Sequence, residues 1–219
     1  MENTVIHLQV KEGQYSITAI GMDKAFKRLV AFLLENRLME NSRLIFFTDG
    51  ATNIRDRIEK YFAFRERTVI LDWLHLEKKR HEYMSMAGKG SKMEKEEFKK
   101  TLAAILLTGR TDKAIQYLFG INSRNIKDNK RLDELKDYIL RKSDYILCYA
   151  LRRELGLTIS SNRVEKENDL VVASRQKHNG MAWSEKGSGA LACIKAAINN
   201  QEMDTWIKKK RTILFKMTA

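Results

Sequence analysis

An acidic side chain stands at the tip of an apolar run in this sequence. Residues 44–47 read Leu-Ile-Phe-Phe, and Thr48, Asp49 and Gly50 follow directly before a helix-like segment. Burying a carboxylate is costly unless a hydrogen-bond partner or a metal ion compensates for its lost hydration. Asp49 is therefore expected either to cap the following helix or to point into a site.

Three further polar residues stand where helices are predicted to begin. Asp72 lies near the end of a segment that reads as a second buried strand over 67–73, His75 follows that segment, and the two could form a helix-start pair. Glu165 comes just after a predicted helix start at 160–162, where a carboxylate interacts favourably with the helix dipole. Taken singly, these residues fit ordinary helix starts at least as well as a site.

The charge balance predicts a polyanionic partner. The chain has 41 Lys and Arg against 28 Asp and Glu, a formal net charge of +13. Phosphate contacts release counterions and so drive the binding of basic proteins to nucleic acid. The excess is concentrated in four runs, and each of them alone could also be a solvated helix face. The runs cover residues 76–82, 89–100, 124–131 and 206–211.

Several classes of protein and site are disfavoured. No run of about 18 apolar residues predicts a transmembrane helix, no strong amphipathic anchor favours a membrane surface, and the first residues do not read as a signal peptide. Cys148 and Cys193 lack metal-ligand spacing and read as reduced core residues of an intracellular, cytoplasmic protein. A phosphate-binding G-x-x-x-x-G-K-[ST] motif is absent, and so is zinc-finger spacing.

The order of predicted elements indicates an α/β fold. Two β-prone segments at 4–10 and 14–20 flank Gly13 and predict a hairpin. Helix and strand patterns then alternate, which favours helices packed on a mixed sheet. The segments are a helix at 23–39, a strand at 43–48, a helix at 52–62, a strand at 67–73 and a helix from Leu74 onward.

Residues 90–155 are helical in period and carry no strand pattern. Three amphipathic helices are predicted, at 95–107, 111–119 and 131–155, in a chain that contains no proline. Further helices are predicted at 160–178 and 183–200. The predicted organisation is an α/β core at 1–89, an all-helical insertion at 90–156, and C-terminal helices with a basic tail at 157–219.

Taken in order, these motifs resemble one family. A strand ending at Asp49, the sequence Asp-Trp-Leu-His at 72–75, an all-helical insertion, and Ser-Asn-Arg-Val-Glu at 161–165 are similar to the catalytic region of bacterial insertion-sequence transposases of the mutator-like kind. That family has an RNase H-like fold in which Asp, Asp and Glu bind two divalent metal ions. The resemblance covers roughly residues 3–200.

The resemblance implies residue roles. Asp49 matches the second Asp and Glu165 the Glu, so both are expected to be catalytic and to bind two Mg²⁺ or Mn²⁺ ions, with Asp72, His75 and Asn162 beside them. The expected reaction is metal-dependent DNA cleavage and strand transfer at transposon ends and target DNA, by a possible homo-oligomer. The expected DNA-binding residues are Arg163, Lys166, Arg175, Lys177, Lys208, Lys209, Lys210 and Arg211.

One departure from the family pattern matters. The first Asp of the family lies on a strand ahead of the first helix, yet 4–10 and 14–20 contain no acidic residue. The expectation is an N-terminally truncated transposase without that strand, weak or inactive by itself, and prone to self-associate through the exposed 4–10 strand. Two alternatives stay open: a non-catalytic DNA-binding remnant and an RNase H-like nuclease without strand transfer.

Overall fold

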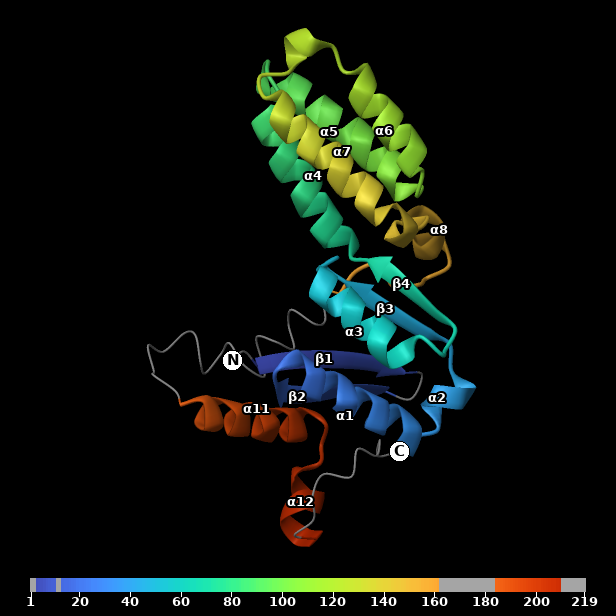
Figure 1. Ribbon diagram of the computed structural model, residues 1–219, viewed down its shortest axis with the longest axis vertical. Helices are drawn as coiled ribbons and strands as arrows, with labels where there is room; N and C mark the ends of the chain where they lie inside the picture. The colour runs from blue at the N-terminus through green and yellow to red at the C-terminus, as the bar shows by residue number, and fades with distance from the viewer. Residues whose placement is uncertain (1–2, 11–12, 162–183, 210–219) are drawn as a thin grey trace. The chain divides into compact units, whose positions relative to one another are not determined.

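The computed structural model describes residues 3–10, 13–161 and 184–209, and it has the mixed α/β class predicted from the sequence (Figure 1). Its contacts group into two compact units. The first unit holds the described residues of 1–44, 53–66 and 162–219, and the second holds 45–52 and 67–161. The units interleave along the chain, so they do not coincide with the ranges 1–89, 90–156 and 157–219.

The first unit is built on the predicted hairpin. Strand β1 (Asn3–Val10) pairs antiparallel with β2 (Gly13–Ile20), and Ile6 lies opposite Ile17. Side chains alternate between the faces of a strand, and the face of β2 that carries Tyr15 packs on α1 (Met22–Glu35), with the Tyr15 and Phe32 rings 4.3 Å apart. Helix α1 buries residues at helical spacing. They are Ala25, Phe26, Leu29, Phe32 and Leu33. However, the helix predicted at 23–39 ends at Glu35, because Arg37 adopts a left-handed conformation before α2 (Leu38–Asn41).

Helix α11 (Glu185–Asn199) packs against β2 as well, and it does so through small residues. A β-carbon at Gly189 would lie 2.4 Å from Cδ1 of Ile20, so glycine permits the close approach of helix and strand. A short helix, α12 (Met203–Lys209), follows α11. Two further helices belong mainly to this unit, α2 (Leu38–Asn41) and α3 (Thr52–Phe62).

Side chains cover the outer edge of β2. The Asn200 amide accepts a hydrogen bond from the Ser16 N–H at 2.8 Å and donates one to the Ser16 carbonyl at 2.9 Å. The Arg28 guanidinium donates to the Thr18 carbonyl. Satisfied edge groups are poor templates for another strand. Among the described residues, β1 pairs with β2 alone, and β3 pairs with β4 alone, so a single mixed sheet is not formed there.

The second unit joins a strand pair to a helical bundle. Strands β3 (Leu44–Thr48) and β4 (Arg67–Leu71) form the pair. One continuous apolar core contains Leu71 of β4 together with residues from all five helices, among them Leu76, Leu106 and Ile139. The helices are α4 (Trp73–Ala87), α5 (Lys92–Leu107), α6 (Thr111–Gly120), α7 (Asn129–Lys142) and α8 (Tyr149–Glu154).

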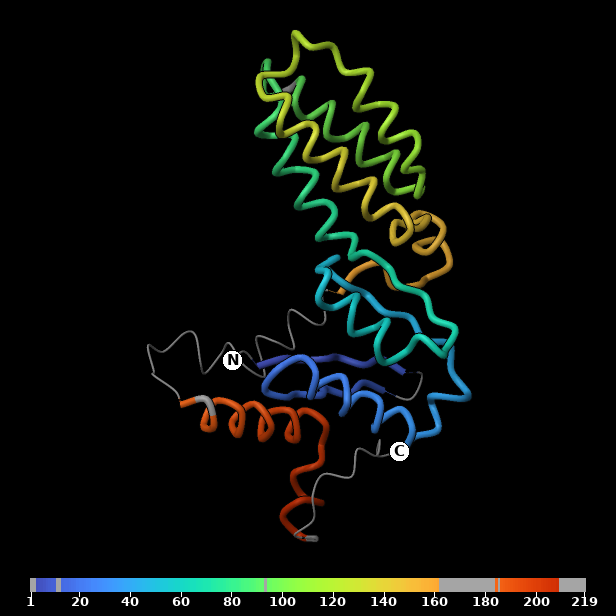
Figure 2. The backbone as a smooth tube through the Cα atoms, viewed as in Figure 1, coloured from blue at the N-terminus to red at the C-terminus, as the bar shows by residue number. Residues whose placement is uncertain are grey.

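The single helix expected at 131–155 is wrong. Helix α7 ends at Lys142, a 3₁₀ turn covers Ser143–Tyr145, and α8 begins at Tyr149, as the backbone trace shows (Figure 2). The break places Tyr149 in the core, where its hydroxyl donates to the Leu71 carbonyl at 2.8 Å. A buried hydroxyl needs such a partner, and this long-range contact overrides the local helical pattern.

A polar link joins α4 to α5 inside the bundle. Arg80 is 5% exposed, donates to both carboxylate oxygens of Glu77 at 3.1 and 2.7 Å, and donates to the Lys99 carbonyl at 2.7 Å. A bidentate guanidinium–carboxylate pair fixes geometry as well as charge. Arg80, in the first basic run of the sequence, is therefore a packing residue.

No helix within the described ranges is long and apolar enough to cross a membrane. Cys148 and Cys193 are free thiols, and both are half-buried.

Candidate site at the ends of β3 and β4

The ends of the two paired strands bring Asp49 and Asp72 to the same place. The Asp72 N–H donates to the Thr48 carbonyl at 2.8 Å, so the last residue of β3 lies beside the first residue after β4. Asp49 follows Thr48 directly, in the position that the sequence predicts. The carboxyl ends of neighbouring strands are where α/β proteins commonly place ligands.

Asp49 closes a turn with one carboxylate oxygen, and its other oxygen accepts no hydrogen bond from the described residues. Its Oδ1 accepts a hydrogen bond from the Ala51 N–H at 2.8 Å, and the Gly50 N–H donates to Thr48 Oγ1 at 3.2 Å. The Asp49 side chain is exposed, and among the described residues no donor reaches Oδ2. Asp49 therefore shapes the turn before α3 and still presents a carboxylate oxygen to a ligand.

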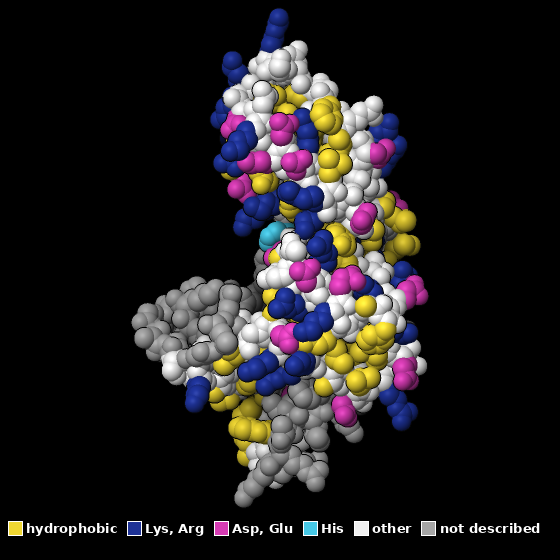
Figure 3. All heavy atoms as spheres, viewed as in Figure 1, with side chains coloured by type: hydrophobic (Ala, Val, Ile, Leu, Met, Phe, Trp, Pro, Cys, Tyr) yellow, Lys and Arg dark blue, Asp and Glu magenta, His cyan; other side chains and the backbone are white. Residues whose placement is uncertain are grey.

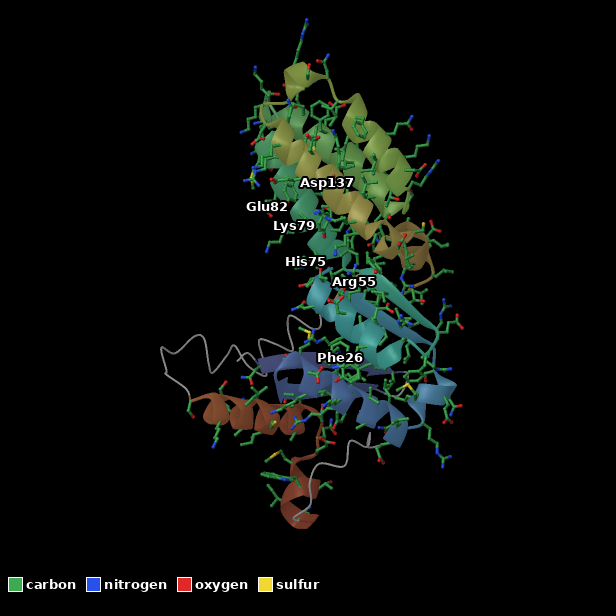
Figure 4. The ribbon with its side chains drawn as sticks, in the orientation of Figure 1. Phe26, Arg55, His75, Lys79, Glu82 and Asp137 are labelled. Atoms are coloured by element: carbon green, nitrogen blue, oxygen red, sulfur yellow. The ribbon has the colours of Figure 1, made fainter. Side chains whose placement is uncertain are left out.

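Asp72 is buried, and both of its carboxylate oxygens accept hydrogen bonds. It is 3% exposed and caps α4, with Oδ1 accepting from the His75 N–H at 3.0 Å. Its Oδ2 accepts from both the N–H and the hydroxyl of Ser161. This is the helix-start arrangement that the sequence allowed for Asp72 and His75. The contact uses the backbone of His75, whose ring is half-buried on the side of α4 that also carries Lys79 and Glu82 (Figure 4).

The segment ahead of Glu165 is held at these strand ends. Besides the two bonds from Ser161 to Asp72, the Trp73 N–H donates to the Ile159 carbonyl at 3.1 Å. Residues 159–161 therefore lie beside the start of α4, next to the turn that carries Asp49.

Most of the other residues expected at the site lie outside the described part of the chain. Lys208 is exposed on α12, 4.0 Å from Asp204, and only the backbone of Lys209 is described. The residues outside are Asn162, Arg163, Glu165, Lys166, Arg175, Lys177, Lys210 and Arg211.

Helix α7 adds two residues to the site that the sequence analysis missed. Lys142 donates from Nζ to the carbonyl of Gly50, and the side chains of Leu71 and Lys142 occupy the space that a Gly50 side chain would need, with Leu71 Cδ1 2.9 Å from the position of a β-carbon. Gly50 has φ +83°, a backbone conformation that favours glycine. Tyr138 lies one turn before Lys142. The sequence could have indicated Tyr138 and Lys142 through their helical spacing with Leu135 and Ile139, since this spacing places all four residues on one face of α7.

The Tyr138 hydroxyl is buried and has no hydrogen-bond partner in the described structure. Burial, followed by the charges of Asp49, Tyr83 and Asp72, raises the pKa of Tyr138 to about 12. The neutral phenol is thus the form that the folded chain favours, because burial and the nearby negative charges both disfavour the phenolate.

Tyr138→Phe is expected to reduce the loss of stability at alkaline pH. The pKa of Tyr138 is 10 in the unfolded chain and about 12 in the folded chain, so the folded chain holds the phenol proton more tightly. The resulting contribution to the free energy of unfolding is fully present below pH 10 and is lost as the pH rises towards about 12. It amounts to roughly 1–2 kcal/mol after allowance for solvent screening. Urea unfolding at pH 9 and pH 11 should show a smaller decrease for the variant than for the wild type. Equal decreases would contradict the buried, charge-coupled position of Tyr138.

The described residues do not by themselves complete a metal site. No group of three His, Cys, Asp or Glu side chains suited to a metal ion occurs among them. Asp49 Oδ2 is a suitable hard oxygen ligand, whereas both oxygens of Asp72 already accept hydrogen bonds. Further carboxylates would have to come from elsewhere, and Glu165 is the nearest in sequence to the anchored Ser161.

Some of the basic side chains at the surface form ion pairs within the protein. Short-range ion pairs join Lys79 to Glu82 at 3.2 Å and Arg131 to Glu134 at 2.7 Å. Basic and acidic side chains are interspersed on the face that Figure 3 shows. Exposed pairs of this kind contribute little stability, so a phosphate backbone can compete for the same cations.

Comparison with known proteins identifies no relative. No model of a protein family, no curated protein and no solved structure matches this chain.

Proposed function

We propose that this chain is part of a transposase catalytic region with an RNase H-like fold, in which Asp49 and Glu165 bind the divalent metal ions that support DNA cleavage and strand transfer. The observation that carries the proposal is the attachment of Ser161 to Asp72, beside the Asp49 turn. Glu165 follows Ser161 by four residues, and four residues span at most about 14 Å. The proposal requires this segment to bring the Glu165 carboxylate to the strand ends that carry Asp49.

The residues of the chain fit the electrostatics of such a site. Two Mg²⁺ or Mn²⁺ ions would stabilise the attacking and leaving oxygens of an in-line phosphoryl displacement. Asp49 supplies a free carboxylate oxygen, and Lys142 holds the backbone of the turn behind it. The formal charge of +13 favours binding of the DNA backbone.

A non-catalytic DNA-binding function is the second candidate. It is favoured by the absence of acidic residues from β1 and β2, which leaves the first Asp of the family pattern without a counterpart there. Under this alternative the basic surface would bind DNA, and Asp49 would only close its turn.

Coupling between metal and DNA distinguishes the two candidates. A metal ion that bridges Asp49, Glu165 and a phosphate must bind more tightly when DNA is present, and DNA must then bind more tightly when the metal is present. We expect Mn²⁺ to strengthen the binding of a duplex oligonucleotide by about fivefold or more, measured by fluorescence anisotropy at constant ionic strength.

The matched variant Asp49→Asn should remove this coupling, since the amide oxygen can still accept from the Ala51 N–H while the charge is lost. DNA binding that is salt-dependent but unaffected by Mn²⁺ in both proteins would instead support the second candidate. Joining of a 3′-hydroxyl DNA end to a second duplex would separate a transposase from a nuclease.

A further inference from the structure

We propose that the first unit contains a binding site for a small primary amine with an apolar body, in a cavity between β2, α11 and α12. The inference is independent of the proposed function, because Asp49 belongs to the second unit and contributes nothing to this cavity.

The cavity has the size of a single-ring ligand. Its volume is about 190 Å³, and its lining is mostly apolar, including Ile17, Ile194, Ala197, Met203 and Trp206. An apolar protein cavity of about 150 Å³ holds benzene. This cavity therefore has room for one ring with a short chain attached.

The mouth of the cavity is accessible to solvent. Ile194 is 40% exposed and Trp206 is 44% exposed, and both line the cavity. Hydrophobic side chains are visible at the surface where α11 and α12 meet (Figure 3). This exposed side is the one from which we expect a ligand to enter.

Glu202 gives the cavity its chemical preference. Its side chain is 7% exposed, and Oε1 accepts a hydrogen bond from the Tyr15 hydroxyl at 2.8 Å. Oε2 is buried and has no hydrogen-bond partner in the described residues. Burial raises the pKa of Glu202, while Tyr15 and Asn200 lower it. A carboxylate oxygen left unpaired in apolar surroundings is unfavourable, and an ammonium group would supply both donors and opposite charge.

The neighbouring donors have partners of their own. The Asn200 amide makes hydrogen bonds to the N–H and the carbonyl of Ser16, and it also lies close enough to Glu202 to lower the pKa of that carboxyl. Arg28, the other charged residue of the lining, donates to the Thr18 carbonyl and lies 3.7 Å from Cys193 Sγ. No hydrogen bond from a described residue reaches Oε2 of Glu202, so this oxygen can still accept one from a ligand.

Titration with 2-phenylethylamine tests the site, with 2-phenylethanol as a neutral probe of the same shape. We expect saturable binding of the amine with a dissociation constant of roughly 1 mM, followed by saturation-transfer NMR and by tryptophan fluorescence. The alcohol should bind at least about tenfold more weakly, because it lacks the positive charge. Equal binding of the two probes, or no saturation by about 10 mM amine, would overturn the proposal.

Three variants locate the binding. Glu202→Gln keeps an oxygen for the Tyr15 hydroxyl and should weaken amine binding about tenfold or more. Ile194→Trp fills the mouth at an exposed position and should weaken the binding of both probes. Ile198→Trp is the matched control, since Ile198 is exposed one helical turn further along α11 and does not line the cavity. Unchanged amine binding in Glu202→Gln, or equal effects of the two tryptophan variants, would overturn the assignment.

Discussion

Replacing Asp72 with alanine is expected to lower the free energy of unfolding of the second unit by about 3–4 kcal/mol. Loss of the helix cap costs about 1 kcal/mol. The substitution also removes the acceptor of the Ser161 N–H and hydroxyl at a position that is 3% exposed. Buried donors left without a partner cost about 1–3 kcal/mol each, and the cost here lies near the lower end of that range because Ser161 is only half-buried.

Asp128→Ala is the matched control for this prediction. Asp128 caps α7 by accepting from the Arg131 N–H at 3.1 Å, and in the described structure its carboxylate accepts no hydrogen bond from a distant segment, because only its backbone N–H reaches the Ala87 carbonyl. The control should therefore lose only about 1 kcal/mol, the cost of a cap. Urea unfolding can be followed by the fluorescence of Trp73, whose ring lies 5.0 Å from that of Tyr149 in the second unit. Equal losses in the two variants would show that the Ser161 attachment contributes nothing.

The second large effect is expected on metal affinity. Asp49→Asn and Glu165→Gln should each weaken Mn²⁺ binding by about tenfold or more, since a carboxylate is replaced by a neutral amide that is a poorer ligand for a hard cation. The fold should be preserved in Asp49→Asn, because the amide oxygen can still close the turn with Ala51. Titration of free Mn²⁺ by electron paramagnetic resonance measures the affinity.

Glu154→Gln serves as the control for charge alone. Glu154 is exposed on α8 in the second unit, and its neutralisation changes the net charge by the same amount as either site variant. Its effect on Mn²⁺ affinity should be less than about twofold, the size expected of a screened surface charge. An equal effect in all three variants would indicate that Mn²⁺ binds non-specifically.

Local patterns predicted the elements that carry Asp49. The hairpin, most of α1 and the strand before Asp49 follow from alternation, helical spacing and turn residues, which act over a few positions. The strand predicted at 67–73 ends earlier, at Leu71, so that Asp72 caps α4. The same patterns failed at 143–148, because the position of Tyr149 depends on the Leu71 carbonyl, 78 residues away in the sequence. Sheet pairing is likewise a long-range property, and the strands pair two by two in the described structure.

The site was predictable only in part for the same reason. The position of Asp49 after a strand could be read from the sequence, and so could the helix-start role of Asp72. The contacts of Ser161 with Asp72 and of Lys142 with Gly50 each connect residues about 90 positions apart. No local pattern encodes such contacts, and they decide which side chains can meet at the strand ends.

The central claim is that Asp49 and Glu165 bind the same metal ions. Fe²⁺ substituted for Mg²⁺ in the presence of ascorbate and peroxide generates hydroxyl radicals that cleave the backbone close to the bound metal, and mass spectrometry locates the cuts. Our account predicts cuts both at 48–51 and at 161–166, suppressed together by excess Mg²⁺ and by Asp49→Asn. Cuts near only one of the two segments, or scattered cuts that Mg²⁺ does not suppress, would contradict it.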